Sequence, residues 1–206
     1  GVGMMRGFSQ SQNLLVIGAE TYSRILDWKD RTTCVFFGGG AGAVVLRETR
    51  APGYLSHYIM NDGSGAEVIN FPAGGARMPA SKQTISDGLH AFQMDGKAVW
   101  KFAIKAFPDA VRKSCEFAGY NPEDIDMLIS HQANINIIKK GMETLGLPME
   151  KSHTTIRDTA NTSGASVPIA LDFAAKAGRL SQNDLLALVG FGGGLSWGGC
   201  LFKWNA

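Results

Sequence analysis

The chain has 206 residues, of which 45% are hydrophobic and 18% charged, and its formal net charge at pH 7 is +2. This composition is typical of a globular protein, and the length suffices for one sizeable core or one and a fraction. No basic run resembles a nucleic-acid-binding tract, and no apolar run approaches the ~20 residues of a membrane span. We therefore expect neither nucleic acid nor membrane as a partner.

Residues 1–7 include neither an initiator methionine nor the charged leader and apolar core of a signal peptide. They are typical of the tail of an amphipathic helix entered midway, so we expect a fragment of a longer protein. Cys34, Cys115 and Cys200 stand in apolar surroundings without metal-ligand spacing. Such thiols favour a reducing compartment, so we expect a cytoplasmic protein and no metal site.

Strands dominate the first sixty residues. We expect them at 13–20, 33–37, 43–47 and 54–60. The first is a continuous apolar run, which predicts cover on both faces, and the glycine-rich segment 38–42 should join the second strand to the third. Residues from about 61 to 90 carry Gly, Ala, Pro and Ser without periodicity, which indicates a long surface excursion.

Helices and strands alternate beyond Met94. Strands are expected at 126–129, 185–189 and 195–204, and helices from about 96, from 135 to 146 and from 166 to 178. Pro108 should kink or divide the first helix before it continues over residues 110–117. Pro168 is tolerable only in the first turn of the last helix. The order of these elements predicts an α/β protein.

Three segments carry polar or glycine residues beside these elements. His131 follows a predicted strand, Asn161 precedes a predicted helix, and the run from Gly192 to Gly194 follows another strand. An imidazole, a carboxamide and free backbone N–H groups are the groups that hold a developing oxyanion. Taken separately, each segment is more often structural, as a satisfied histidine, an N-cap or a plain turn.

In their order and spacing, HQAN, NTSGAS and GFGGGLSWG resemble the C-terminal half of beta-ketoacyl-acyl carrier protein synthase III, a thiolase-fold condensing enzyme. DRTTC and GGGAGA extend the resemblance over nearly the whole chain. It implies a thiolase-like α/β fold with layered helices and five-stranded mixed sheets. Residues 1–60 would end the first βαβαβ half, 61–93 would connect, and 94–206 would form the complete second half. An echo of residues 37–40 in 191–194 agrees with two related halves.

The resemblance also implies a reaction, the decarboxylative condensation of an acyl-CoA primer, acetyl-CoA first, with malonyl-acyl carrier protein. This condensation starts type II fatty acid synthesis. Loss of carbon dioxide leaves an enolate, whose oxygen a ring N–H of His131 and the amide of Asn161 would hold. The backbone around Gly193 would form a second oxyanion hole. Coenzyme A enters as a substrate thioester, and no cofactor is implied.

The nucleophilic cysteine of the family falls before the first residue of this chain. Cys34 lies in a predicted strand and is expected to be a small core residue. Cys115 on a helix and Cys200 on the last strand are no better candidates. We therefore expect the parent protein to be a condensing enzyme and the isolated chain to be inactive.

By the same resemblance, several residues match positions that bind substrate. The implied contacts with coenzyme A are Gly96, Trp100, Asn134 and Ile137, and Phe191 matches a residue near the active-site tunnel. Trp100 could equally be helix core. The resemblance further implies that complete subunits pair as homodimers through sheet edges.

Docking of the acidic carrier protein is implied for Lys101, although a solvated lysine is an equal alternative. Asn136 stands where an arginine often contacts the carrier, and Lys139 and Lys140 lie one helical turn away. Gly39 replaces an aspartate that is common in its loop, and residues 158–160 differ from the commoner pattern with an aromatic and a glycine before the Asn.

These departures keep two alternatives open. One is a specialised relative that makes a polyketide or a signalling molecule from an unusual primer. The other is a non-catalytic subunit paired with an active homologue. Such a partner would be free to lose His131, Asn161 or the glycine-rich loop, and all three are present.

Overall fold

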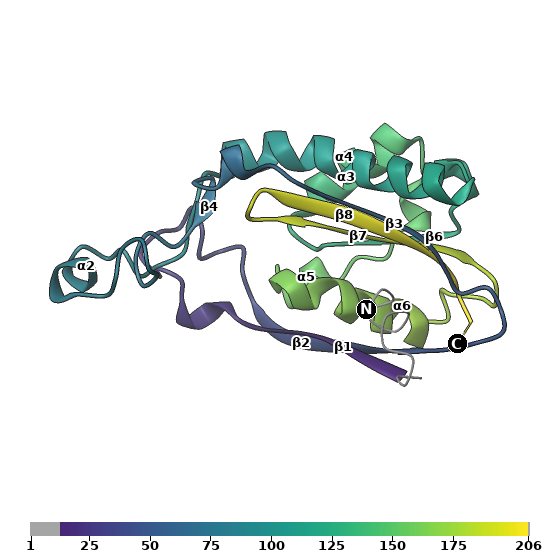
Figure 1. Cartoon of the computed structure of the whole chain (residues 1–206), viewed down its shortest axis with the longest axis horizontal. Helices are drawn as coiled ribbons and strands as arrows, with labels where there is room; N and C mark the ends of the chain where they lie inside the picture. Colours follow the sequence, from purple (N-terminus) through teal and green to yellow (C-terminus); the bar gives the residue numbers. More distant parts are fainter. Residues whose placement is uncertain (1–12, 206) are drawn as a thin grey trace.

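The computed structural model describes residues 13–205 (Figure 1). Its strands are β1 (Asn13–Thr21), β2 (Gly39–Arg47), β3 (Tyr54–Asn61), β4 (Ile69–Asn70), β5 (Gln93–Met94), β6 (Met127–Ser130), β7 (Leu185–Gly192) and β8 (Ser196–Lys203). Its α-helices are α2 (Lys82–Ser86), α3 (Gly96–Ala118), α4 (Ile135–Leu145), α5 (Ile156–Thr159) and α6 (Ser166–Lys176). Short 3₁₀ turns include η3 (Pro122–Asp124) and η5 (Ser163–Ala165).

The principal sheet has the strand order β3-β8-β7-β6, with β6 parallel to β7 and the other pairs antiparallel. Figure 1 shows α3 and α4 on one face and α5 and α6 on the other. Phe107 and Ile138 belong to the core on the first face, whereas Ile129 and Ala170 belong to the core on the second. Cover on both faces explains the short, wholly apolar start of β6.

The predicted strands at 54–60, 126–129, 185–189 and 195–204 are confirmed as β3, β6, β7 and β8. The resemblance implied five-stranded sheets, whereas this sheet has four paired strands within residues 13–205. Leu128 of β6 also makes an isolated parallel bridge to Ser152, which belongs to none of the named strands. β3 precedes the connecting excursion in sequence, yet it pairs with β8.

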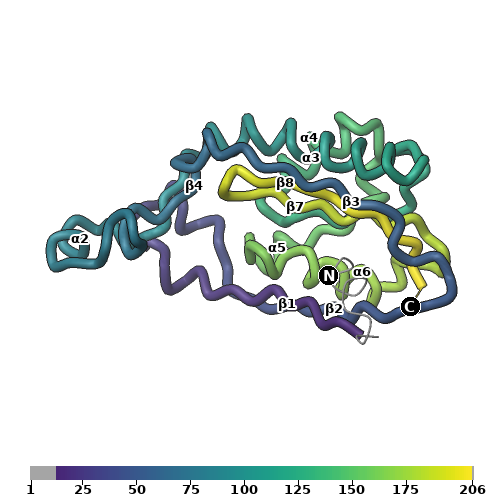
Figure 2. The backbone as a smooth tube through the Cα atoms, viewed as in Figure 1, coloured from purple at the N-terminus to yellow at the C-terminus, as the bar shows by residue number. Residues whose placement is uncertain are grey.

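β1 and β2 form a separate antiparallel pair below α6 (Figures 1 and 2). The predicted strand at 13–20 is confirmed, but cover on both faces is wrong for the described residues. Leu15, Ile17 and Val45 are 56%, 61% and 67% exposed on the outer face. The inner face lies so close to its neighbours that a Cβ at Gly18 would come within 2.5 Å of the Gly164 carbonyl oxygen.

The predicted strand at 33–37 is wrong, because this segment forms turns. The carboxylate of Asp30 accepts hydrogen bonds from the backbone N–H and hydroxyl of Thr32 and from the hydroxyl of Thr33. These bonds favour a local turn over a strand. The glycine run belongs to β2 itself instead of joining two strands. Cys34 is consequently half-buried on a turn and is not a core residue.

The segment between β3 and α3 extends away from the two layers, with α2 near its tip (Figure 2). It confirms the predicted surface excursion and includes short elements. α2 begins with a reciprocal capping box between Ser81 and Thr84. β4 and β5 pair antiparallel and return the chain to the body. Both ends of the excursion therefore lie near the same point.

α3 runs without interruption through Pro108, so the predicted division of this helix is wrong. Phe107 and Pro108 are both buried, and their packing against the sheet offsets the missing hydrogen bond. The other two predicted helices are confirmed. Gly146 ends α4 in a left-handed conformation with φ 70°, and Pro168 stands in the first turn of α6. No helix within residues 13–205 has the length and apolarity to cross a bilayer.

Candidate active site

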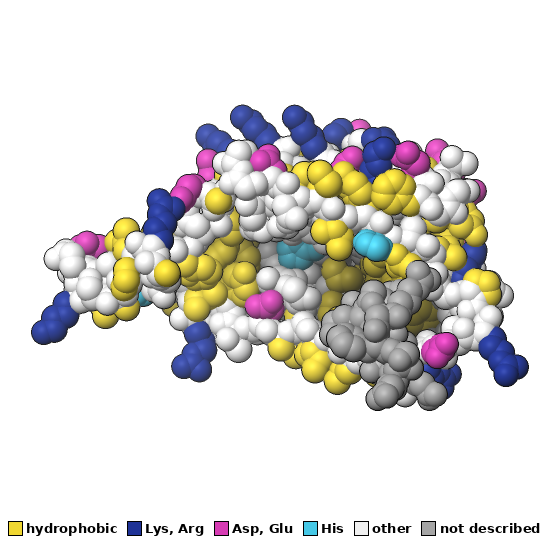
Figure 3. All heavy atoms as spheres, in the orientation of Figure 1, with side chains coloured by type: hydrophobic (Ala, Val, Ile, Leu, Met, Phe, Trp, Pro, Cys, Tyr) yellow, Lys and Arg dark blue, Asp and Glu magenta, His cyan; other side chains and the backbone are white. Residues whose placement is uncertain are grey.

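A cavity of about 440 Å³ lies where the ends of β6 and β7 meet α3, α4, η5 and the base of the excursion. Figure 3 shows the molecule hollowed between its two layers, with apolar side chains around the hollow. Eight predicted site residues from four separate segments line the cavity: Gly96, Trp100, His131, Asn134, Ile137, Asn161, Phe191 and Gly193. Their convergence follows from the parallel pairing of β6 with β7, which brings the segments after both strands to one end of the sheet.

His131 is the first residue after β6, and its backbone N–H donates to the Val189 carbonyl at 2.7 Å. Its Nδ1 lies 2.6 Å from the hydroxyl oxygen of Ser166, at the first residue of α6. The ring meets Phe191 edge-on, with 5.3 Å between centroids. Burial lowers the pKa of His131 to about 4, so the imidazole is neutral at pH 7.

The hydroxyl of Ser166 is shared among three groups. It donates to the carbonyl oxygen of Ser163 at 2.7 Å, accepts from the backbone N–H of Gln132 and lies beside Nδ1 of His131. A hydroxyl has one proton, so its orientation selects which ring nitrogen of His131 is protonated. Sequence reasoning missed Ser166, although it stands within the NTSGAS segment.

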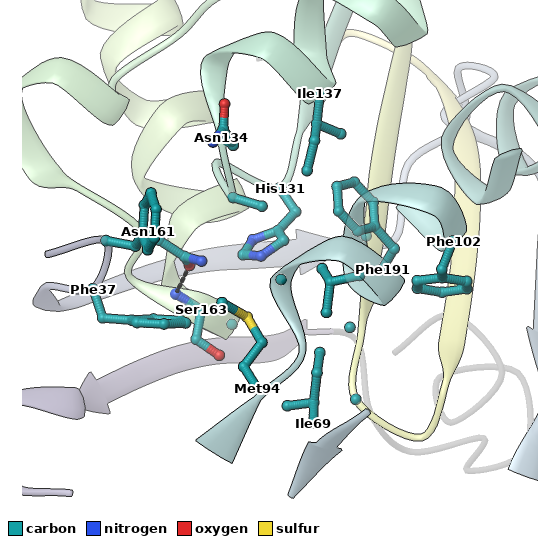
Figure 4. A pocket seen from close by; sticks show the side chains of 18 of the residues that line it. Phe37, Ile69, Met94, Phe102, His131, Asn134, Ile137, Asn161, Ser163 and Phe191 are labelled. Atoms are coloured by element: carbon teal, nitrogen blue, oxygen red, sulfur yellow. Dashed lines mark hydrogen bonds between the residues drawn. The ribbon is translucent and has the colours of Figure 1, made fainter. Parts of the chain in front are cut away.

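Asn161 is buried and lies between α5 and η5. Its Oδ1 accepts the backbone N–H of Ser163 at 2.9 Å, which orients the carboxamide. Figure 4 shows the amide nitrogen pointing toward the ring of His131. Because Oδ1 is occupied, the free face of the group is its donor face. A ring and an amide from distant segments thus meet at one point of the cavity.

Gln132 was missed as a positioning residue. Its side chain is wholly buried, with Nε2 donating to the Ser130 carbonyl at 2.7 Å and Oε1 accepting from the Thr155 backbone at 2.9 Å. These bonds tie the loop after β6 to the start of α5. A buried, fully satisfied amide fixes the loop that carries His131.

The remaining predicted lining residues play different structural parts. Asn134 is the N-cap of α4, with Oδ1 accepting from Asn136 at 2.8 Å, and Ile137 is 4% exposed. Trp100 is 37% exposed, so the alternative prediction that it is a buried core residue of the helix is wrong. Gly193 lies in the turn between β7 and β8. A Cβ atom placed on it would lie 3.4 Å from Cγ2 of Ile69. Gly193 therefore presents bare backbone to the cavity.

An aromatic cluster at the opposite wall was not predicted. Phe37 stacks on Tyr22 at 4.9 Å and meets Phe92 edge-on at 4.9 Å, and Tyr22 and Phe92 are 5.5 Å apart. All three line the cavity with Ile69 and Met94. Tyr22 and Phe92 lie outside the predicted strands and helices, and Phe37 was expected in a strand, so no local pattern could have placed the three together. The excursion thus supplies part of the cavity wall.

The predicted docking lysines lie outside the cavity. Lys101 is exposed on α3, and Lys139 and Lys140 are exposed on α4. Lys140 pairs with Glu143 at 3.0 Å, whereas Lys101 and Lys139 make no ion pair within residues 13–205. Docking of a carrier at these side chains stays a prediction.

None of the three cysteines lines the cavity. Burial raises the pKa of Cys115 to about 11 and that of Cys200 to about 12, so both are thiols at neutral pH. Residues 13–205 contain no group of three or more His, Cys, Asp or Glu side chains placed to hold a metal ion.

Solved structures place this fold in a known class. The chain superposes over 98% of its length on 62% of a beta-ketoacyl-[acyl carrier protein] synthase III from Thermus thermophilus, with TM-score 0.87 and 36% identity. The corresponding protein from Pseudomonas aeruginosa PAO1 gives TM-score 0.89 and 34% identity over 100% and 62% of the two chains. A priming beta-ketosynthase of the R1128 polyketide pathway gives 0.84 and 32% over 95% and 58%. The fold and site define a thiolase-fold protein.

Sequence comparisons narrow the class to one family. The model of the 3-oxoacyl-[acyl-carrier-protein] synthase III C-terminal domain matches residues 115–204, and the synthase III model matches residues 3–70. Beta-ketoacyl-[acyl-carrier-protein] synthase III of Caldanaerobacter subterraneus is 47% identical over 94% of this chain, and that of Clostridioides difficile is 45% identical over 94%. The chain belongs to this family and spans 59% of the length of these relatives.

The low pKa of His131 predicts a pH-dependent stability. Between pH 6.5 and about 4 the unfolded chain binds a proton that the folded form does not, so the free energy of unfolding falls as the pH decreases. The loss should reach roughly 3 kcal/mol at pH 4. Urea unfolding of the whole protein from pH 7 to 4 measures it. His131→Gln should flatten the profile more than His153→Gln, and equal profiles in wild type and His131→Gln would contradict this assignment.

Proposed function

We propose that this chain forms the decarboxylation and condensation side of a 3-oxoacyl-[acyl-carrier-protein] synthase III. A malonyl thioester on the carrier protein loses carbon dioxide, and the resulting enolate attacks the carbonyl carbon of an acyl thioester, whose thiolate leaves to give the 3-oxoacyl product. The single observation that supports this most strongly is the meeting of a neutral imidazole and an oriented carboxamide in one cavity. Both groups can be fixed before the charge appears, which is the requirement for stabilising an enolate.

In this proposal His131 donates through Nε2–H, which requires the Ser166 hydroxyl to turn its one proton from the Ser163 carbonyl oxygen to Nδ1. Asn161 donates through its amide N–H₂. The backbone at Gly193 serves the tetrahedral intermediate that forms when the enolate attacks. The chain's own cysteines are outside the cavity, so the acyl-accepting thiol belongs to another part of the protein.

Substrate delivery follows from the shape of the cavity. Gly96, Trp100, Asn134 and Ile137 lie on one wall and contact the pantetheine arm or nucleotide of coenzyme A. The aromatic cluster on the opposite wall, centred on Phe37, receives the acyl chain of the primer. Acetyl-CoA is the leading primer. No cofactor takes part, because the thioester itself is the reactive group.

The acidic carrier protein docks at Lys101, Lys139 and Lys140, which are exposed on α3 and α4. Asn136, exposed on the same helix as the last two, leaves this contact with one positive charge fewer than an arginine would give. The complete protein is a cytoplasmic homodimer that pairs through sheet edges. Its reaction starts type II fatty acid synthesis.

A second candidate function is the priming of a polyketide. It is favoured by the likeness to the priming ketosynthase of the R1128 pathway, at 32% identity and TM-score 0.84. The same cavity would then accept a primer other than acetyl-CoA. The two functions share the decarboxylation step and differ in the acyl chain.

An assay of the whole protein tests the proposal. Purified enzyme is given malonyl-acyl carrier protein with acetyl-, butyryl-, isobutyryl- or hexanoyl-CoA, and both carbon dioxide release and the 3-oxoacyl product are measured. Preference for acetyl-CoA supports the fatty acid function, whereas preference for a longer or branched primer supports polyketide priming. Absence of product and of carbon dioxide release with every primer would favour a non-catalytic partner subunit.

A further inference from the structure

Ala160, the residue before Asn161, has a backbone conformation that favours glycine. Its φ is 56° and its ψ is −163°, a region that residues with a Cβ atom rarely occupy. Ser163, on the other side of Asn161, also has a positive φ, of 48°. Within residues 13–205, only Asn183 is a further non-glycine residue with positive φ. Two of these three residues therefore flank one buried amide.

Hydrogen bonds on both sides impose the conformation of Ala160. On its N-terminal side, the Ala160 N–H donates to the Ile156 carbonyl at 3.0 Å and completes the last turn of α5. On its C-terminal side, the Asn161 N–H donates to the carbonyl oxygen of Phe36 at 2.9 Å. The Asn161 carbonyl oxygen accepts from the backbone N–H of Gly38, also at 2.9 Å. The chain must therefore pass from a helical turn to a parallel bridge within a single residue.

The methyl group of Ala160 lies next to Gly38. An ideal Cβ at Gly38 would lie 3.3 Å from the Ala160 Cβ and 2.6 Å from the Thr159 carbonyl oxygen. The methyl group of Ala160 thus lies against a position that itself admits only glycine.

Residues after Asn161 complete the arrangement. The Asn161 Oδ1 accepts from Ser163 at 2.9 Å, so the backbone after the amide is fixed by the side chain it orients. In Figure 4 the carboxamide stands between Phe37 and His131, with its nitrogen toward the ring. Rotation of the 160–161 peptide would carry this nitrogen away from His131.

We infer that Ala160 is a positioning residue for Asn161: its strained backbone, held by the helix on one side and the bridge on the other, fixes the direction in which the amide donates. This inference rests on the proposed function for its catalytic consequence. The strain itself is a property of the fold and can be measured without any activity. Strain of this kind persists where surrounding bonds over-determine the conformation, as they do at residue 160.

The strain is tested by stability. Ala160→Gly should raise the melting temperature of the whole protein by roughly 2–4 °C, because glycine adopts this conformation without steric conflict. The matched control is Ala177→Gly, at the end of α6 with φ −79°, where the same change should lower it by roughly 1–3 °C. Opposite signs support the inference. A fall in both variants would overturn it.

The positioning role is tested by kinetics. A valine at residue 160 cannot adopt φ 56°, so Ala160→Val should displace Asn161 and reduce kcat for condensation at least tenfold with KM for malonyl-acyl carrier protein unchanged. Ala177→Gly should keep the parental kcat. If wild type condenses and Ala160→Val keeps its kcat, the inference fails. If wild type itself does not condense, the proposed function fails, and the melting comparison still decides whether residue 160 is strained.

Discussion

Replacing Asn161 by alanine is expected to lower the condensation rate of the whole protein about a hundredfold. The buried carboxamide is oriented by Ser163 and has its donor face toward His131. Loss of one preorganised donor to a developing oxyanion raises the barrier by about 3 kcal/mol. His131→Ala should have an effect of similar size. Single-turnover measurement of carbon dioxide release from malonyl-acyl carrier protein reports the step directly.

The matched control is Asn136→Ala, an exposed asparagine on α4 that is outside the cavity. It should leave the rate of decarboxylation at saturating substrate within twofold of the parent. The double variant of His131 and Asn161 should lose less than the product of the two single losses, because both donors act on one oxygen. Parental rates in both single variants would show that neither group holds the enolate.

The elements with strong periodicity could be predicted from the sequence, because their burial follows the local pattern. The apolar run over residues 126–129 is a strand covered on both faces, and Gly146 ends its helix in the left-handed conformation that glycine favours. The segment at 33–37 could not be predicted, because the carboxylate of Asp30 accepts from the backbone N–H of Thr32 and the hydroxyl of Thr33, and this local turn outweighs the strand propensity of the apolar residues. The prediction that β1 is covered on both faces was also wrong, because the burial of a face depends on what packs against it.

The candidate site likewise contains residues that could be predicted from the sequence and residues that could not. The positions of His131, Asn161 and Gly193 at one cavity followed from the resemblance to a family, and their structural surroundings agree with it. Ser166 and Gln132 stand in the same segments but support the site by hydrogen bonds across 34 or 35 and 23 residues of sequence. Such long-range partners leave no local pattern.

Phe107→Ala is expected to cause a large loss of stability. The side chain is fully buried on α3, and its ring lies so close to α4 that a Cβ at Gly141 would come within 2.4 Å of it. Removal of a buried phenylalanine ring leaves a cavity and typically destabilises a protein by about 3–5 kcal/mol. Phe117→Ala on the same helix, where the ring is 61% exposed, should change the free energy of unfolding by less than about 1 kcal/mol.

The contact with Gly141 allows a sharper test of why the ring matters. Gly141→Ala alone should destabilise, because the new methyl group would overlap the ring of Phe107. In the Phe107→Ala background the same methyl group enters the space that the ring has left, so it should be neutral or stabilising. Urea unfolding of the four proteins gives the coupling between the two sites. If the losses in the free energy of unfolding from the two single variants simply add in the double variant, the two helices adjust to each change independently. Phe107 also meets Phe191, which supports the ring of His131, so the core packing of α3 extends to the imidazole itself.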